Sequence, residues 1–263
     1  MRWWVCWGIL LSSSVAAAET VTCPAPTGGS SKLAALDASE RIAFLHRTVD
    51  AQATYARRWK WAWFTIGSVT TASSLGVTIG FAVGGGAPNV QQANVIDNAI
   101  VSGFSLFTPA FSLLFALRVE SDAPVIDALL RDTGEGTAGT CMVLSRVEEL
   151  FAKDADDEAF NTGWFAQITA MLGLGAMFSI MAVEAASTWT SNRSVSEAHW
   201  LNAGLNTGVG LILTEAQILT TPTGAASAYK RYLKGELGGS APKVHASLGP
   251  LPQAPGLLIG LSF

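Results

Sequence analysis

Four long apolar stretches constrain this chain more than any other feature of its sequence. They cover roughly residues 61–83, 95–117, 164–183 and 200–220. Each is close to the ~20 residues that a helix needs to cross ~30 Å of hydrocarbon. The chain is 49% hydrophobic and only 14% charged, whereas a soluble domain carries about 25% charged residues. The sequence therefore predicts an all-α, polytopic membrane protein. Its four transmembrane helices form two tandem hairpins, with amphipathic helices flanking them.

Residues 1–18 have the pattern of a secretory signal peptide. Arg2 supplies a positive charge, an apolar run follows, and small alanines at 16–18 precede a cleavage site before Glu19. The alternative is an uncleaved anchor helix, which the shortness of the apolar run disfavours. If this signal is cleaved, the mature protein belongs to the cell envelope, which we expect to be bacterial. Its N-terminus then lies on the exported side of the membrane.

Polar segments divide the rest of the chain. We expect a flexible lead at 19–36, a helix and the first hairpin at 37–118, and an acidic polar segment at 119–163. The second hairpin covers 164–220, and an amphipathic helix with a C-terminal tail covers 221–263. Asp37 or Ser39 is a candidate N-cap for the helix before the first span. Thr220 or Thr221, followed by Pro222, is a candidate start for the last helix.

The two halves share a plan at an offset of 105 positions. Arg41 and Trp59 of the first half correspond to Arg146 and Trp164 of the second, with the same spacing. Residue identity at this offset is otherwise close to chance. This pattern predicts an architectural duplication in which the two hairpins have the same orientation, hence a parallel repeat.

The sidedness signals conflict. Four spans after a cleaved signal place all three polar regions on the exported side, yet these regions hold nearly all Lys and Arg, against the positive-inside rule. An uncleaved first helix or an outer-membrane location would remove the conflict. The alternating Leu257, Ile259, Leu261 and Phe263 resemble the C-terminal strand signal of outer-membrane barrel proteins. The inner membrane is slightly favoured over the outer membrane.

Small residues recur every four positions along the first span and again in the fourth. Such a stripe lets another helix approach closely. It predicts helix packing within the bundle or association with a second copy or another envelope protein. The residues are Ser68, Ala72, Gly76, Gly80, Gly84, Gly204 and Gly208.

Three acidic residues lie in or beside the spans: Asp97, Glu184 and Glu215. A charge inside a bilayer is costly, so intramembrane ionisable residues are candidates for function. Asp97 and Glu184 lie near span ends, where they can reach water. Glu215 is deeper, and it predicts either interhelical hydrogen bonding or a small channel or transporter.

The remaining motifs point to no cofactor. Cys23 and Cys141 lie in polar segments of an exported chain and are candidates for one disulfide. The acidic run at 154–158 is expected to be a solvated helical face. Calcium is the alternative, but the run lacks the Gly and Glu of an EF-hand loop. The net charge of -4 argues against nucleic acid as a partner.

An enzyme is not expected. Residues 103–106, with Ser105, faintly resemble the serine loop of intramembrane rhomboid-like proteases, and His199 is a candidate base. However, the second Gly of that loop is absent and four spans are too few for that family. The sequence therefore predicts a non-enzymatic membrane protein with the lipid bilayer and other envelope proteins as partners.

Overall fold

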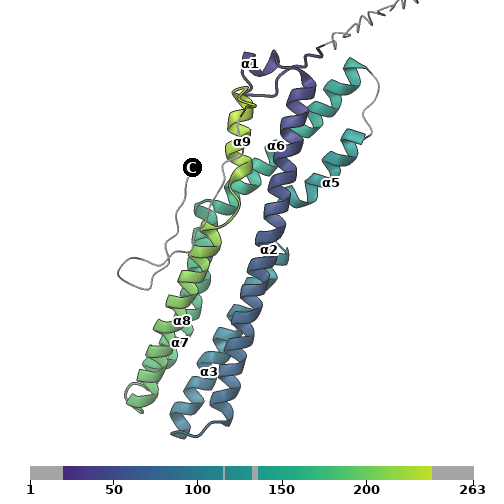
Figure 1. Cartoon of the computed structure of the whole chain (residues 1–263). Helices are drawn as coiled ribbons and strands as arrows, with labels where there is room; N and C mark the ends of the chain where they lie inside the picture. Colours follow the sequence, from purple (N-terminus) through teal and green to yellow (C-terminus); the bar gives the residue numbers. More distant parts are fainter. Residues whose placement is uncertain (1–19, 115, 132–135, 239–263) are drawn as a thin grey trace, which may run out of the picture.

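The computed structural model describes residues 20–114, 116–131 and 136–238, and the described secondary structure is helical apart from one isolated bridge between Thr22 and Asp37. This confirms the all-α prediction. The proposed signal at 1–18 and the alternating C-terminal residues lie outside the described residues. The molecule is elongated, with a bundle of polar helices at one end and two long hairpins extending from it (Figure 1).

Within the described residues, the helices follow one another with short connections. They are α1 (Ser31–Ala34), α2 (Ala38–Val83), α3 (Pro88–Ser105), α4 (Phe107–Leu114), α5 (Arg118–Arg131), α6 (Thr137–Thr162), α7 (Trp164–Thr188), α8 (Arg193–Leu219) and α9 (Gly224–Leu233). The first hairpin consists of the distal half of α2 with α3 and α4. The second consists of α7 and α8, and both hairpins return to the polar end (Figure 1).

The helix boundaries follow the duplicated plan. Helix α2 ends at residue 83 and α7 at 188; α3 begins at 88 and α8 at 193; α4 ends at 114 and α8 at 219. Each pair is 105 positions apart, the offset found in the sequence. The two hairpins run in the same direction, and α3 packs against α8 between them (Figure 1). The helix boundaries therefore repeat at the offset found in the sequence, and the parallel repeat of membrane hairpins stays a prediction.

Three helical stretches among the described residues are long and apolar enough to cross a membrane: Ala38–Val83, Pro88–Arg131 and Thr137–Thr188. Their composition suggests a membrane location. Helix α8, the fourth predicted span, has the required length at 27 residues. It is less apolar because Asn202, Asn206, Glu215 and Gln217 interrupt it.

The second predicted span is broken at Leu106, between α3 and α4. Pro109 explains the break, because proline cannot donate a backbone hydrogen bond to the carbonyl four residues earlier and its ring crowds that turn. The ring packs against α2 at Gly67, where an added Cβ would lie 2.7 Å from the Pro109 Cδ. Gly67 thus permits the close contact between α2 and α4.

The polar end is a compact bundle of α1, the first half of α2, α5, α6 and α9. Its core contains the fully buried Leu45, Ile126, Leu144 and Phe151. Asp37 caps α2 as expected, accepting a hydrogen bond from the Ser39 amide at 2.8 Å. The expected start of the last helix is wrong by a few residues: α9 begins at Gly224 with Thr223 as its N-cap position, so Pro222 precedes the helix.

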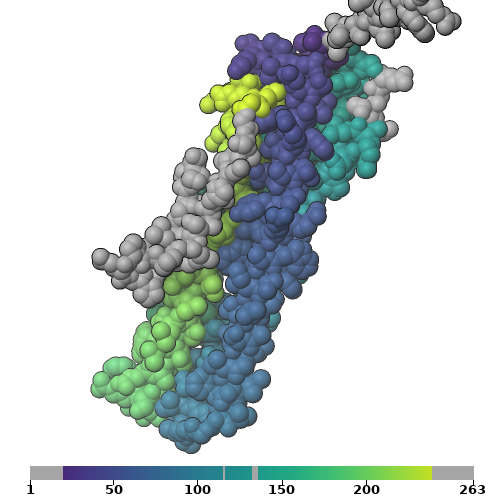
Figure 2. All heavy atoms as spheres, in the orientation of Figure 1, coloured from purple at the N-terminus to yellow at the C-terminus, as the bar shows by residue number. Residues whose placement is uncertain are grey.

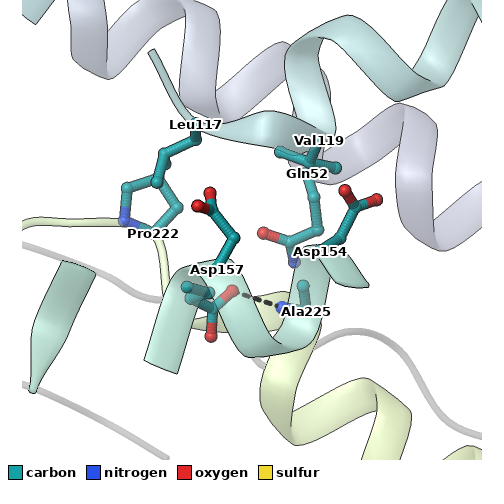
Figure 3. A pocket seen from close by; sticks show the side chains of 8 residues that line it. Gln52, Leu117, Val119, Asp154, Asp157, Pro222 and Ala225 are labelled. Atoms are coloured by element: carbon teal, nitrogen blue, oxygen red, sulfur yellow. Dashed lines mark hydrogen bonds between the residues drawn. The ribbon is translucent and has the colours of Figure 1, made fainter. Parts of the chain in front are cut away.

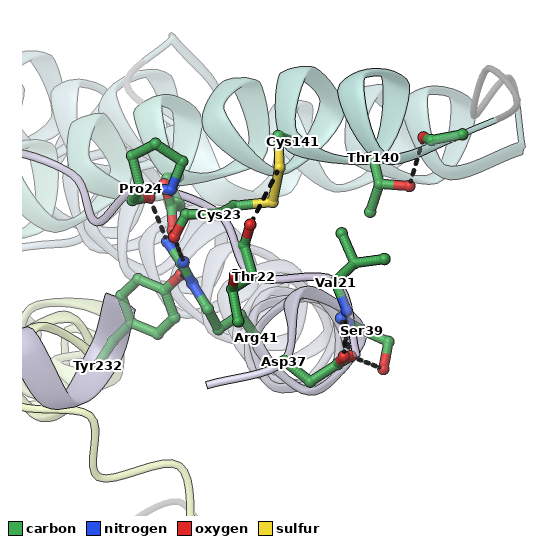
Figure 4. The surroundings of a disulfide bond; sticks show 12 residues. Val21, Thr22, Cys23, Pro24, Asp37, Ser39, Arg41, Thr140, Cys141 and Tyr232 are labelled. Atoms are coloured by element: carbon green, nitrogen blue, oxygen red, sulfur yellow. Dashed lines mark hydrogen bonds and ion pairs between the residues drawn. A yellow bond between two sulfur atoms is a disulfide. The ribbon is translucent and has the colours of Figure 1, made fainter. Parts of the chain in front are cut away.

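A disulfide joins Cys23 to Cys141 and ties the N-terminal segment to α6 (Figure 4). Beside it, the fully buried Arg41 donates to the carbonyl oxygens of Cys23 at 2.7 Å and Pro24 at 3.1 Å. The Arg41 guanidinium also pairs with the Glu148 carboxylate and donates to the Tyr232 hydroxyl at 3.0 Å. One buried network therefore links the N-terminal segment, α2, α6 and α9.

Burial and the Glu148 carboxylate raise the pKa of the Tyr232 phenol above its usual value. Tyr232 therefore stays protonated and donates its hydroxyl proton to Glu148. Arg41 and Glu148 compensate each other's charge, which is the condition for burying either of them.

Candidate functional site: a cavity and two polar clusters

A cavity of about 560 Å³ lies between the two hairpins. Its walls come from α2, α3, α4, α6, α7 and α8, and Figure 2 shows the surface hollowed between α8, in green, and α2, in blue. Most of the lining is apolar and aromatic, including Trp59, Phe107, Phe111, Phe165, Leu174 and Met177. The volume is within the range of small-molecule sites.

The break in the second span explains why the hairpins separate here. Helix α3 packs against α8 and α7, whereas α4 packs against α2. The hairpins meet at the loop end through α3, and at the polar end Trp63 Nε1 of α2 donates to Thr220 Oγ1 at the end of α8 at 3.0 Å, so the cavity lies between two contacts. A few polar side chains line the resulting cavity, among them Ser112, Asn161, Thr169, Thr214 and Gln217. An apolar site with a few convergent polar groups suits an amphiphilic ligand.

A polar cluster lies where the hairpins meet. His199 Nδ1 on α8 is 2.8 Å from Asp97 Oδ1 on α3 and 3.6 Å from Glu184 Oε2 on α7. Asp97 is fully buried, and His199 is 4% exposed. The structure therefore brings Asp97 and Glu184, two of the three predicted intramembrane acidic residues, to the same histidine.

Two asparagines complete this cluster. Asn202 Nδ2 donates to Asp97 Oδ2 at 2.8 Å and to Asn94 Oδ1 at 2.9 Å. Asn94 and His199 are 105 positions apart, as are Asp97 and Asn202. The duplication thus places a polar pair at matched positions of α3 and α8, and the two pairs face each other. Sequence reasoning missed both asparagines, although the offset combined with polarity inside the spans was a usable signal.

Glu215 lies apart from this cluster. Its carboxylate accepts a hydrogen bond from Gln167 Nε2 of α7 at 3.5 Å, and the side chain is half-buried. Glu215 is not among the residues that line the cavity, although its neighbours Thr214 and Gln217 are. Glu215 therefore has a hydrogen-bond partner on a neighbouring helix and does not line the cavity.

A second cluster, acidic, lies in the polar bundle. Asp154, Asp157 and Gln52 surround a space of about 10 Å³, room for about one water molecule, at the junction of α2, α6 and the start of α9 (Figure 3). The expectation of a solvated face at 154–158 is wrong for two members. Asp154 is 2% exposed and Glu158 is 5% exposed, because α5 and α9 cover this side of α6.

Burial governs the protonation of these two carboxyls. It raises the pKa of Asp154 to about 8, with further contributions from the neighbouring Asp122 carboxylate. Neither Asp154 oxygen accepts a hydrogen bond from the described residues. Burial also raises the pKa of Glu158, to about 7, although its carboxylate accepts hydrogen bonds from the Ala225 and Ala226 amides at 2.7 and 3.2 Å. Near neutral pH, Asp154 is therefore mainly protonated.

The small-residue stripe faces outward. Ala72, Gly76, Gly80 and Gly84 of the first span are exposed, as are Gly204 and Gly208 of the fourth; Ser68 is half-buried. An added Cβ at Gly76, Gly80, Gly204 or Gly208 meets no described atom within 4 Å. The close helix contacts within the chain occur instead at Gly67 and at Gly210, which approaches Leu174. The stripe is therefore free to contact lipid or another molecule.

The described residues do not assemble a serine–histidine pair. Ser105 Oγ donates to the Ser102 carbonyl at 2.9 Å, and His199 Nδ1 faces Asp97 and Glu184.

No known protein family, curated protein or solved structure matches this chain.

Proposed function

We propose that this chain is a non-enzymatic integral membrane protein that holds a lipid acyl chain between its two hairpins. The observation that carries the proposal is the apolar cavity of about 560 Å³ lined by residues of both hairpins. In this proposal α8 also crosses the membrane, because it is antiparallel to α7 and matches it in length. Two hairpins then give four crossings and leave the polar bundle on one side.

The disulfide supports an exported polar bundle. Disulfides persist in oxidising compartments and are rare in the cytosol, and the Cys23–Cys141 bond lies in this bundle. We therefore place the protein in a bacterial cell envelope, with the inner membrane slightly favoured, after cleavage of residues 1–18. Mass spectrometry of membrane-purified protein should find Glu19 as the N-terminus. An intact N-terminus would reject export by signal cleavage.

The position of the cavity selects its occupant. Its lining belongs largely to the predicted spans, so the cavity lies at the depth of lipid hydrocarbon, and water there would meet mainly apolar walls. Asn161 and Gln217 lie toward the polar bundle and are suited to contact the polar end of an amphiphile. A membrane lipid is the amphiphile that is present at this depth in large excess.

Filling the cavity tests the proposal. Gly173 lines it, and an added Cβ there meets no described atom within 4 Å, so Gly173→Phe should occupy the space without a backbone clash. Gly175→Phe is the matched control: it lies on the same helix, is exposed, also has open space, and does not line the cavity. Native mass spectrometry after mild detergent extraction should show fewer retained lipids for Gly173→Phe alone. Equal retention by both variants and the wild type would refute the acyl-chain site.

A second candidate function is self-association through the small-residue stripe. The observation favouring it is that Gly76 and Gly80 are exposed beside open space in the first span, where a second copy of α2 could approach closely. Gly80→Leu should then lower the dimer fraction in cross-linking of native membranes, while Gly175→Leu should not. Monomeric wild-type protein would reject this candidate. Conduction through Glu215 has less support, because that side chain bonds to Gln167 and does not line the cavity.

A further inference from the structure

The polar cluster between the hairpins has the composition of a metal site. One ligand atom each from Asp97, Glu184 and His199 lie within 4.8 Å of one another. They come from α3, α7 and α8, so the three residues meet only through the packing of the two hairpins. One imidazole nitrogen and two carboxylate oxygens form a donor set that suits first-row divalent ions such as Zn²⁺ and Mn²⁺.

One of the two measured separations between the donor atoms fits a bound ion, and the other is close to it. Ligands bound at ~2.0–2.2 Å to a tetrahedral ion lie roughly 3.3–3.6 Å apart. His199 Nδ1 is 2.8 Å from Asp97 Oδ1 and 3.6 Å from Glu184 Oε2. The shorter distance is that of a direct hydrogen bond, and the longer one is beyond hydrogen-bonding range. The His199–Glu184 pair thus already has ligand spacing, and the His199–Asp97 pair would have to open by about 0.5 Å to reach it.

Glu184 supplies a reason for an additional group at this point. Its Oε2 is buried and accepts no hydrogen bond from the described residues, although it faces His199 Nδ1. A buried carboxylate oxygen without a partner is costly. A bound cation would give this oxygen a partner.

Charge balance points the same way. Asp97 and Glu184 bring two negative charges into a region bounded by apolar spans, against one imidazole. A divalent ion would carry the charge that balances the two carboxylates. Neutrality is strongly favoured where the dielectric constant is low.

The surroundings hold one ligand in place, as outer-shell groups of metal sites do. Asn202 Nδ2 donates to Asp97 Oδ2 and holds this carboxylate against His199 Nδ1, which is 2.8 Å from Oδ1 and 3.0 Å from Oδ2. The neighbouring Ser196 Oγ donates to the Ala185 carbonyl at 2.6 Å, which fixes α8 against α7 beside Glu184. Glu184 is four residues from the end of α7, and its side chain is 36% exposed, so an ion has a route from the adjoining loop.

We propose that Asp97, Glu184 and His199 bind one first-row divalent metal ion that clamps the two hairpins together. The ion would join α3 of the first hairpin to α7 and α8 of the second. The site stands at the opposite end of the hairpins from the polar bundle (Figure 1). It does not require an occupied lipid cavity.

The test uses the full chain purified in detergent without a polyhistidine tag and treated with a chelator. Zn²⁺, with Mn²⁺ as a second probe, is titrated by calorimetry, and elemental analysis counts the ions retained per chain. We expect about one Zn²⁺ or Mn²⁺ per chain and a higher thermal midpoint on binding. Glu184→Gln should weaken binding at least about tenfold. Its fold should persist, since no described residue donates to Glu184 Oε2.

Glu197→Gln is the matched control. Glu197 lies on the same end of α8 but is exposed and pairs with Arg193, so its replacement should leave metal affinity unchanged. Absence of stoichiometric binding by the wild type would overturn the proposal. Equal affinity of folded Glu184→Gln and wild type would overturn it too. Stabilisation by acid but not by either metal would show that the cluster holds a proton instead, which also overturns it.

Discussion

The buried carboxyl of Asp154 predicts that this protein loses stability as the pH rises through neutrality. The unfolded carboxyl titrates near 3.8, whereas burial and Asp122 raise the folded pKa to about 8. Between these two values the folded protein holds a proton that the unfolded chain has released. Each rise in pH therefore favours the unfolded state. The stabilising contribution is complete below pH 3.8 and is lost as the pH passes about 8.

The size of the effect follows from the displacement of the pKa. One pKa unit corresponds to about 1.4 kcal/mol, so the full displacement sets an upper limit of roughly 6 kcal/mol. Relaxation and water entry reduce the effective penalty of a buried charge to several kcal/mol. A loss of about 3 kcal/mol corresponds to a fall of roughly 6–12 °C in the thermal midpoint of a protein of this size.

The pH window separates Asp154 from its neighbour. Glu158 also has a raised pKa, from 4.5 to about 7, so both carboxyls contribute to the loss of stability below pH 7. Between pH 7 and 8 most of the remaining slope belongs to Asp154, because Glu158 has by then lost half or more of its proton. Asp154→Asn removes the titrating group with little change in shape. It should therefore flatten the dependence of the midpoint on pH in that interval.

The assay is thermal unfolding of the detergent-solubilised protein from pH 5 to pH 9, followed by tryptophan fluorescence. Asp156→Asn is the control, because Asp156 is two residues away on the same helix and exposed. The control should keep the wild-type slope between pH 7 and 8. An unchanged slope in Asp154→Asn would refute the argument that this buried carboxyl is neutral in the folded protein.

Three further perturbations test the packing. Cys141→Ser should lower stability by about 2–4 kcal/mol and abolish the sensitivity of the thermal midpoint to reductant, since it removes the disulfide. Glu148→Gln leaves a buried guanidinium without its counter-ion and should cost about 3–5 kcal/mol in denaturant titration, whereas Glu149→Gln, at an exposed site, should leave the unfolding midpoint close to that of the wild type. Gly67→Leu should collide with the proline ring of α4 and cost about 1–3 kcal/mol or more, whereas Gly76→Leu has open space and should leave the thermal midpoint in detergent unchanged.

The sequence by itself determined the local features of this protein. Apolar runs of membrane length predicted the long helices, because backbone groups in lipid must be bonded within the helix. Asp37 marked the start of α2 through its short side chain, which bonds to the first-turn amides. The offset of 105 positions predicted a duplicated plan that the helix boundaries follow. Each of these signals lies within one segment or in the spacing of segments.

Only the tertiary structure decided which helix faces meet. In a soluble bundle the apolar face of a helix is its buried face. In lipid the outward face is apolar too, so the hydrophobic pattern does not distinguish the packed face of a helix from its lipid-facing face. For this reason the stripe at Gly76 and Gly80 was a reasonable packing surface, yet it faces outward, and Gly67 makes the close contact.

The same limit applied to the charged residues. Asp154 belongs to an acidic run, and such a run predicts a face exposed to solvent. It is buried because α5 and α9 pack over α6. Asp97 is far in the chain from Glu184 and His199, and its contact with them depends on α3 packing against α7 and α8. Contacts between distant segments arise from how helices pack together, and a single sequence records this only through cues as weak as the matched polar pairs of the two halves.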